Sequence, residues 1–267
     1  MATISAGGVL TISIDLETSA GSASQRRPIE STLKSLLKGL ELKGIAATFP
    51  LVSPAESAYT STILKGSPVH EVALIADRSW LAGNSRRATL AANLVRHGSQ
   101  SRAAGYSLST LALAGIQLTD HWDLFIKHGF TAIRTTRKTS SGLLSWRSHL
   151  ARFAASHIGN DPSAIRFGLW DLQTTMHFPS GGDLRRAWSG IDHAAASGMA
   201  FHLCVDVAAL AAGGSRDLER FERVTEYARR RERAGALRIR TLRSLAAQLS
   251  QGRQTRPAQS VLRPRAA

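Results

Sequence analysis

The sequence predicts an α/β protein in which seven or eight parallel strands form a β/α barrel. Two observations indicate this fold class. Strand patterns alternate with amphipathic helical patterns over about 250 residues, the layout of a parallel sheet covered by helices. The apolar content of 43% is also sufficient for an ordinary core. An open, doubly wound sheet is the alternative architecture.

The individual elements follow from local periodicity. The first strand is predicted at residues 10–15, because Leu10, Ile12 and Ile14 alternate there with polar residues. A helix follows from Pro28 and ends at Gly44. Further strands are predicted to begin at Ile45, Val69, Tyr106, Phe130, Ala164, Met199 and Leu237. Helices are predicted between them at residues 84–104, 119–128, 182–196 and 216–234.

These elements are expected to form one domain spanning residues 1–249. Residues 250–267 are polar, basic and contain proline, so we expect a basic disordered tail there. The first residues lack the basic and long apolar regions of a signal peptide. No segment approaches the roughly 20 apolar residues needed to cross a bilayer. We therefore expect a cytoplasmic protein without a membrane partner.

The net charge and the cysteine count indicate which partners are favoured and which kinds of site are excluded. The formal net charge is +15, mostly from arginine, which favours an acidic polymer such as nucleic acid or an anionic glycan. No nucleic-acid-binding motif accompanies this charge, and arginines on solvated helix faces also explain it. Cys204 is the only cysteine, which excludes a disulfide framework and a thiolate metal cluster. Its apolar neighbours predict a buried, inert thiol.

Charged residues stand at the ends of several predicted strands. In a β/α barrel the reactive groups lie at the C-terminal ends of the strands, so these residues are expected near one opening. Alternation places Asp15 and Glu17 on one face of the first strand. Each acid can instead cap the helix that follows its strand. The strand ends supply Asp15, Glu17, Asp77, Arg134, Asp171 and Asp206.

Five stretches of the chain form an ordered series of motifs. They are LTISIDLE from Leu10, HEVALIADRSW from His70, GFTAIRTT from Gly129, FHLCVDVAAL from Phe201 and YARRRERAGALRIRTLRSLAAQL from Tyr227. The series spans about residues 8–249 and resembles the motifs of the polysaccharide deacetylases, the family with a NodB-homology domain, in the family's order. The resemblance implies a distorted β/α barrel of the deacetylase type that removes N-acetyl or related acyl groups from sugars.

The family's site consists of a catalytic Asp base, an acidic His, and a divalent metal held by one Asp and two His. The resemblance places Asp15 on the base and Arg134 on the arginine that orients it. Asp206 takes the place of the acidic His. The metal-ligand positions are occupied by Leu16, Ile75 and Ser79.

The metal site is therefore expected to be absent, although the family implies a divalent metal. Three protein ligands are the usual minimum at a catalytic zinc site, and an aliphatic side chain cannot coordinate. The stretch from His70 is then a buried strand that has lost its ligands. Two alternatives remain: Asp15, Glu17 and Asp77, with Asp206, supply oxygen ligands for Mg²⁺ or Mn²⁺, or Asp15 and Asp206 act as a base and acid pair without metal.

Three functions are consistent with these residues. The first is deacetylation of a carbohydrate, the hydrolysis of a carbon–nitrogen bond outside peptides. The second is an inactive member of the family, a pseudoenzyme that binds a glycan, a nucleotide-sugar or a protein. Trp80 and Trp170 would then offer stacking surfaces beside Asp171. The third is an anion or nucleic-acid binder.

His202 is expected to be a hydrogen-bonded core residue. It should lie about 13 Å from Asp206, on the same face of the same strand.

Overall fold

The computed structural model describes residues 7–16, 23–66, 70–76, 80, 86–113, 121–135, 162–166, 168–178 and 184–254. In chain order the elements are β1 (Gly8–Asp15), α1 (Ala23–Leu42), β2 (Thr48–Leu51), α2 (Thr60–Lys65), β3 (Glu71–Ala76), α3 (Arg86–Ala103), β4 (Thr110–Leu113), α4 (Trp122–Lys127), β5 (Ala132–Arg134), β6 (Ser163–Arg166), β7 (Leu169–Asp171), β8 (Met176–Phe178), α6 (Leu184–Ser197), β9 (Ala200–Asp206), α7 (Val207–Ala212), α8 (Gly214–Arg233), β10 (Leu237–Arg240) and α9 (Leu242–Gln254).

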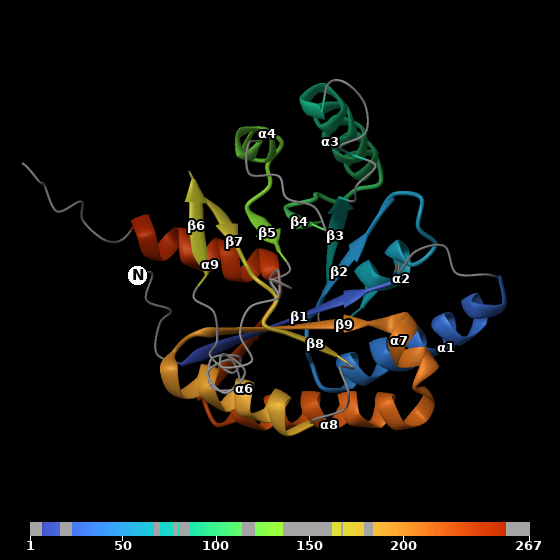
Figure 1. The fold of residues 1–267 in the computed structure, drawn as a ribbon, viewed down its shortest axis with the longest axis vertical. Coiled ribbons are helices and arrows are strands. Elements are labelled where there is room, and N and C mark those ends of the chain that lie inside the picture. Colours follow the sequence, from blue (N-terminus) through green and yellow to red (C-terminus); the bar gives the residue numbers. More distant parts are fainter. Residues whose placement is uncertain are drawn as a thin grey trace, which may run out of the picture.

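The strands form one curled sheet, which confirms the predicted barrel-type α/β fold. Its order is β6-β7-β5-β4-β3-β2-β1-β9-β8, and β10 pairs with β1. All described pairs are parallel except β6 with β7. Figure 1 shows the curl, since β1, β8 and β9 run across the view while β3 and β6 stand nearly upright. The path ends at β6 and β8 without a described pairing between them, so the described sheet is a half-barrel.

Strand β1 is the centre of this sheet. It pairs with β9 in register from Val9 to Asp15. Its other edge is shared, because β10 pairs with the first half of β1 and β2 pairs with it at Ser13. These pairings fix the position of every side chain on β1, including the carboxylate at its C-terminal end.

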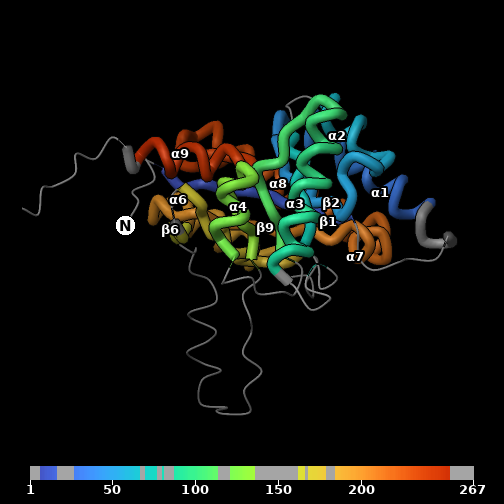
Figure 2. Tube along the Cα trace, turned by 90° about the horizontal axis from the view of Figure 1, so that it is seen from above, coloured from blue at the N-terminus to red at the C-terminus, as the bar shows by residue number. Residues whose placement is uncertain are grey.

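Two apolar clusters cover the two faces of the sheet. The larger cluster joins Leu10, Ile12 and Ile14 of β1 to the surrounding helices. The smaller one lies on the inner face and joins Val9 and Trp170 to side chains of α9. Figures 1 and 2 place α9 at the end of the sheet where β1 begins and α7 where β1 ends. Helix α9 therefore closes the N-terminal end of the half-barrel, and the C-terminal strand ends form its mouth.

The structure corrects one predicted element and adds short elements that were not predicted. The stretch from Ala164 was predicted as one strand, but it forms the antiparallel pair β6 and β7. Gly168 lies between them with a φ of 85°, a backbone conformation that favours glycine and reverses the chain. Strand β8 and helix α7 were not predicted, because three and six residues are too short for periodicity to show.

The structure describes only the first residues of the predicted tail, and it describes them as helix. Helix α9 continues through Ser250 to Gln254, beyond the expected boundary at residue 249. Ser250 accepts a hydrogen bond from the Trp170 indole at 2.9 Å. Residues 255–267 lie outside the described residues. Among the helices that the structure describes, none is both long and apolar enough to span a membrane.

The tight packing of β1 against α6 gives a test of the fold. A Cβ added at Gly8 would overlap the backbone carbonyl of Ala194. We expect Gly8→Ala to lower the free energy of unfolding by about 1–3 kcal/mol, because backbone atoms cannot move aside as a flexible side chain can. The matched control is Gly252→Ala in α9, where an added Cβ meets no atom within 4 Å. Urea denaturation of both variants measures the effect, and equal stability of the two would contradict this packing.

Candidate functional site

The registered pairing of β1 with β9 brings two rows of polar side chains together. Thr11 pairs with His202, Ser13 with Cys204, and Asp15 with Asp206. Residues paired across adjacent parallel strands point to the same face, and residues two apart on one strand share that face. All six side chains therefore face the inside of the half-barrel, with Asp15 and Asp206 at the mouth.

Arg134 reaches this face from β5. Its side chain is 3% exposed, and its guanidinium meets the Asp15 carboxylate in a two-pronged ion pair. Nη2 donates to Oδ2 of Asp15 at 2.8 Å, and Nη1 donates to Oδ1. Burial by itself lowers the pKa of Arg134, but the Asp15 charge, the Cys204 sulfur and the hydrogen bond to Asp15 together outweigh it, and the net shift is upward. The guanidinium therefore stays charged inside the half-barrel.

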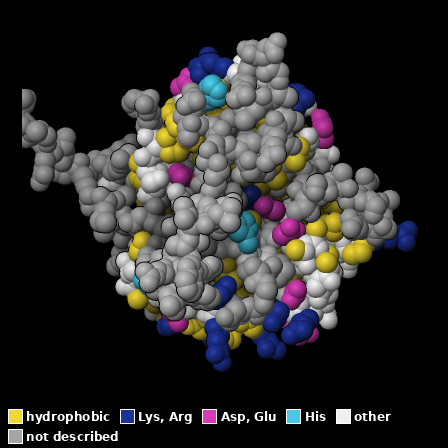
Figure 3. Space-filling view, in the orientation of Figure 1, with side chains coloured by type: hydrophobic (Ala, Val, Ile, Leu, Met, Phe, Trp, Pro, Cys, Tyr) yellow, Lys and Arg dark blue, Asp and Glu magenta, His cyan; other side chains and the backbone are white. Residues whose placement is uncertain are grey.

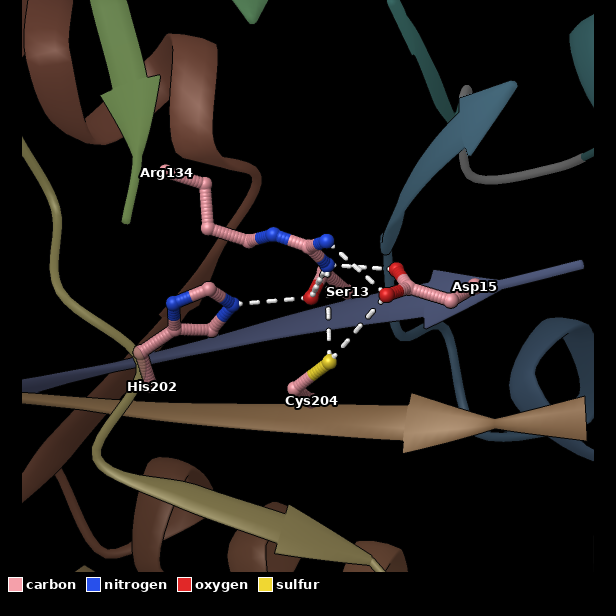
Figure 4. Close-up of polar contacts among 5 residues, drawn as sticks. All are labelled: Ser13, Asp15, Arg134, His202 and Cys204. Atoms are coloured by element: carbon pink, nitrogen blue, oxygen red, sulfur yellow. Dashed lines mark hydrogen bonds and ion pairs between the residues drawn. The ribbon is translucent and has the colours of Figure 1, made fainter. Parts of the chain in front are cut away.

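Ser13 and Cys204 complete the surroundings of the guanidinium (Figure 4). Nη1 of Arg134 also donates to Ser13 Oγ at 2.9 Å and to Cys204 Sγ at 3.4 Å. The thiol lies 3.5 Å from Oδ2 of Asp15 and can donate to it. Burial raises the pKa of Cys204 to about 12, although Arg134 opposes the shift. The thiol is therefore buried and protonated, as the sequence predicted, and it is not a nucleophile.

His202 lies two residues before Cys204 on β9, and it shares the hydrogen-bond network of Ser13 and Arg134. Its Nε2 is 2.9 Å from Ser13 Oγ. Because Arg134 donates to this oxygen, the Ser13 hydroxyl proton is available to point at Nε2. Burial, with a further contribution from Arg134, lowers the pKa of His202 to about 3. His202 is thus a neutral, hydrogen-bonded core histidine, and Ser13 links it to the ion pair.

Asp206 has a structural role that the sequence analysis gave as its alternative. Its Oδ1 accepts from the backbone N–H groups of Ala208 at 2.9 Å and Ala209 at 3.1 Å, which caps α7. The cap fixes the carboxylate beside Asp15, its register partner. Asp15, Arg134 and Asp206 therefore come together at one place, from three different strands.

The structure adds His177, which no sequence motif marks as a site residue. It lies on β8 in register with Cys204 and is exposed. Desolvation of the ring, followed by the charge of Arg134, lowers the pKa of His177, while Asp15 and Asp206 raise it. Figure 3 shows histidine and carboxylate side chains together at the surface near the ends of β1, β8 and β9.

The metal that the family resemblance implies does not fit the described residues. Leu16 and Ile75, at two of the ligand positions, are each 5% exposed and carry no donor atom. Leu16 packs in the larger apolar cluster, and Ile75 lies on β3 as the register partner of Ala112. Within the described ranges no three His, Cys, Asp or Glu side chains are placed to hold a metal ion. Glu17, Asp77 and Ser79 lie outside those ranges.

Of the three residues expected to bind a substrate, the two tryptophans are buried and the aspartate is partly buried. Trp80 is 3% exposed and stacks on His97 with ring centroids 5.5 Å apart. Trp170 is 1% exposed within the inner apolar cluster. Both rings are therefore packed inside the protein, and their role in stacking on a substrate stays a prediction. Asp171 is partly buried, and burial raises its pKa although hydrogen bonds from Thr135 and Gln173 oppose the shift.

His70 and Glu71 form hydrogen bonds between strands at the end of the sheet opposite the mouth. Nδ1 of His70 accepts from Ala47 N at 3.1 Å. The Glu71 carboxylate accepts from Thr48 at 2.8 Å, from Thr110, and from the backbone N–H of Arg243 at 2.9 Å. Burial raises the pKa of Glu71, and these hydrogen bonds oppose the shift. The pair therefore connects β2, β3, β4 and α9 at the end opposite the mouth.

Comparisons with known proteins agree with this fold. No family model matches the sequence, and neither does any curated protein. A protein from Mycobacterium smegmatis, provisionally named a polysaccharide deacetylase, superposes with a TM-score of 0.64 at 13% identity over 93% of this chain and 94% of its own. A 4-alpha-glucanotransferase from Thermococcus litoralis gives a TM-score of 0.59 at 8% identity over 91% of this chain and 40% of its own. The chain therefore has the deacetylase-type fold, as the motifs implied.

The buried ion pair predicts a large effect of removing one partner. Arg134→Met retains an unbranched apolar stem but leaves the Asp15 carboxylate without its counter-charge. We expect the free energy of unfolding to fall by about 3 kcal/mol, the lower end of the range for breaking a buried pair, because the Asp15 side chain is 20% exposed. The control is Arg87→Met, whose pair with Asp123 has side chains 52% and 61% exposed. Its unfolding should be unchanged within error, and similar losses in both variants would contradict the account.

Acidification should destabilise the fold partly through His202. Its pKa of about 3 in the fold lies below the ordinary 6.5, so the unfolded chain binds a proton that the folded chain does not. The resulting stability is complete above pH 6.5 and is lost as the pH falls toward 3, by up to about 1.4 kcal/mol per pH unit. Urea denaturation at several pH values should therefore show a shallower loss for His202→Gln than for the wild type. Parallel curves would exclude a buried neutral His202.

Proposed function

We propose that the protein hydrolyses N-acyl groups on a carbohydrate, using side chains at the mouth of the half-barrel. One observation supports this most strongly. Asp15, His177 and Asp206 lie on neighbouring strands at the mouth, above the buried charge of Arg134. Partly exposed ionisable groups beside a fixed buried cation are typical of sites that activate water and move protons.

The substrate class follows from the fold and the charge. One structure with this fold bears the name polysaccharide deacetylase and another is a glucanotransferase, so both names refer to carbohydrates. The family resemblance of the motifs adds the acyl group as the part that reacts. The net charge of +15 favours an acidic glycan or a nucleotide-sugar among carbohydrate substrates.

The chemistry that we propose uses protein groups only. Leu16 and Ile75 supply no metal ligand, so water has to be activated by a side chain. Asp15 and Asp206 are register partners, so two carboxylates lie side by side at the mouth. Asp15 is held by Arg134 and Asp206 caps a helix, so both are fixed in position beside the group that moves the proton.

A second candidate is a protein that binds its sugar without hydrolysing it. The aliphatic side chains at two metal-ligand positions favour this candidate, because a family that depends on a metal loses its usual water activation with its ligands. The cation set of Asp15, Glu17 and Asp77, which the sequence suggests, is a third candidate. Elemental analysis of the purified protein identifies that arrangement directly.

Acetate release from oligomers of N-acetylglucosamine tests the proposal. We expect release to continue after treatment with EDTA and to be unaffected by added Mn²⁺ or Zn²⁺. Asp206→Asn should lower kcat/KM by at least about 100-fold, because it removes the charge. Asparagine caps a helix as well as aspartate does, so the stability of this variant should be unchanged. Asp123→Asn on α4 is the matched control and should retain full activity.

The outcomes separate the candidates. Sugar binding without acetate release, measured by titration calorimetry, would favour the binding protein. Release that needs a stoichiometric metal ion would favour the cation set. Neither binding nor release with neutral or acidic acetylated glycans would contradict a carbohydrate function.

A further inference from the structure

His177 is an exposed side chain on edge strand β8, beside the inner face of the half-barrel. Strand β8 lies at the edge of the sheet and pairs only with β9 among the described strands. The register places His177 beside Cys204, on the face that carries Asp15 and Asp206. His202 and Cys204 on that face are almost completely buried, whereas His177 is exposed. A water molecule or substrate at the mouth can therefore reach its imidazole.

Both oxygens of the Asp15 carboxylate already have hydrogen-bond donors. Each accepts from Arg134, and Oδ2 also lies within reach of the Cys204 thiol. Two parallel hydrogen bonds from a guanidinium fix the orientation of a carboxylate. The ion pair therefore acts as a fixed electrostatic element.

We propose that His177 is the proton-transfer group of this site, and that Asp15 and Asp206 stabilise its charged form. The proposal rests on the hydrolytic function proposed above. Neutral imidazole takes a proton from water as the water oxygen bonds to the acyl carbon. The imidazolium then gives that proton to the sugar nitrogen as the carbon–nitrogen bond breaks. The products are a carboxylic acid and an amine, and His177 returns to its neutral form.

The charges around His177 suit this cycle. Arg134 on β5 disfavours the imidazolium, while Asp15 on β1 and Asp206 on β9 favour it. His202 on β9 also faces this group but stays neutral, since its own pKa is about 3. The pKa of His177 lies below the ordinary value, with desolvation as the largest cause, so the ring is neutral and ready to accept a proton at neutral pH.

Two measurements on the full chain test this assignment. The first is a pH titration of the His177 ring by NMR in the wild type and in Asp206→Asn. Loss of the Asp206 charge should move the His177 midpoint to lower pH, while Asp123→Asn should leave it unchanged. An unmoved midpoint in Asp206→Asn would overturn the proposed stabilisation of the imidazolium.

The second measurement is acetate release by His177→Ala and His177→Gln. We expect kcat/KM to fall by about 100- to 10,000-fold in both variants and the acidic limb of the wild-type pH profile to disappear. Added imidazole should restore release in His177→Ala, because the side chain is exposed and leaves an accessible space. Unchanged release and pH profile in these variants would overturn the role of His177 and leave the proposed function standing. If the wild type releases no acetate, the proposed function fails and the proton-transfer role fails with it.

Discussion

The structure depends on one buried charge, the guanidinium of Arg134. A charged group inside a protein is tolerated only where a counter-charge and hydrogen-bond acceptors surround it. Here β1 supplies Asp15 and Ser13, and β9 supplies Cys204. The ion pair connects β5 to β1 across the inside of the half-barrel. The site therefore forms only because the sheet curls and brings these two strands to face each other.

Burial sets the chemical state of the two ionisable groups next to this charge. His202 and Cys204 are buried and remain neutral, which confines ionisation to the side chains at the mouth. Helix α9 closes the opposite end of the half-barrel with apolar side chains and with the hydrogen bonds around Glu71. Access to the inner face is therefore expected from the C-terminal strand ends, where α/β proteins commonly bind ligands.

Much of the fold could be predicted from the sequence, because long apolar alternation marks β1 and β9 and places Asp15 and Asp206 at their ends. Arg134 could be placed at a strand end as well. The pairing of Ser13 with Cys204 could not, because register between distant strands depends on tertiary packing and not on spacing. His177 was missed for a different reason: its strand has three residues and shows no periodicity. The burial of Trp80 and Trp170 also depends on packing partners that the sequence does not reveal.

A double-mutant cycle between Arg134 and Asp15 tests the central claim most directly. The free energy of unfolding would be measured for Arg134→Met, Asp15→Asn, the double variant and the wild type. If the pair is the interaction on which the inner face depends, the double variant should be little less stable than either single variant, with a coupling energy of at least about 2 kcal/mol. Losses that add within about 0.5 kcal/mol would show that the two residues act independently and would contradict the account.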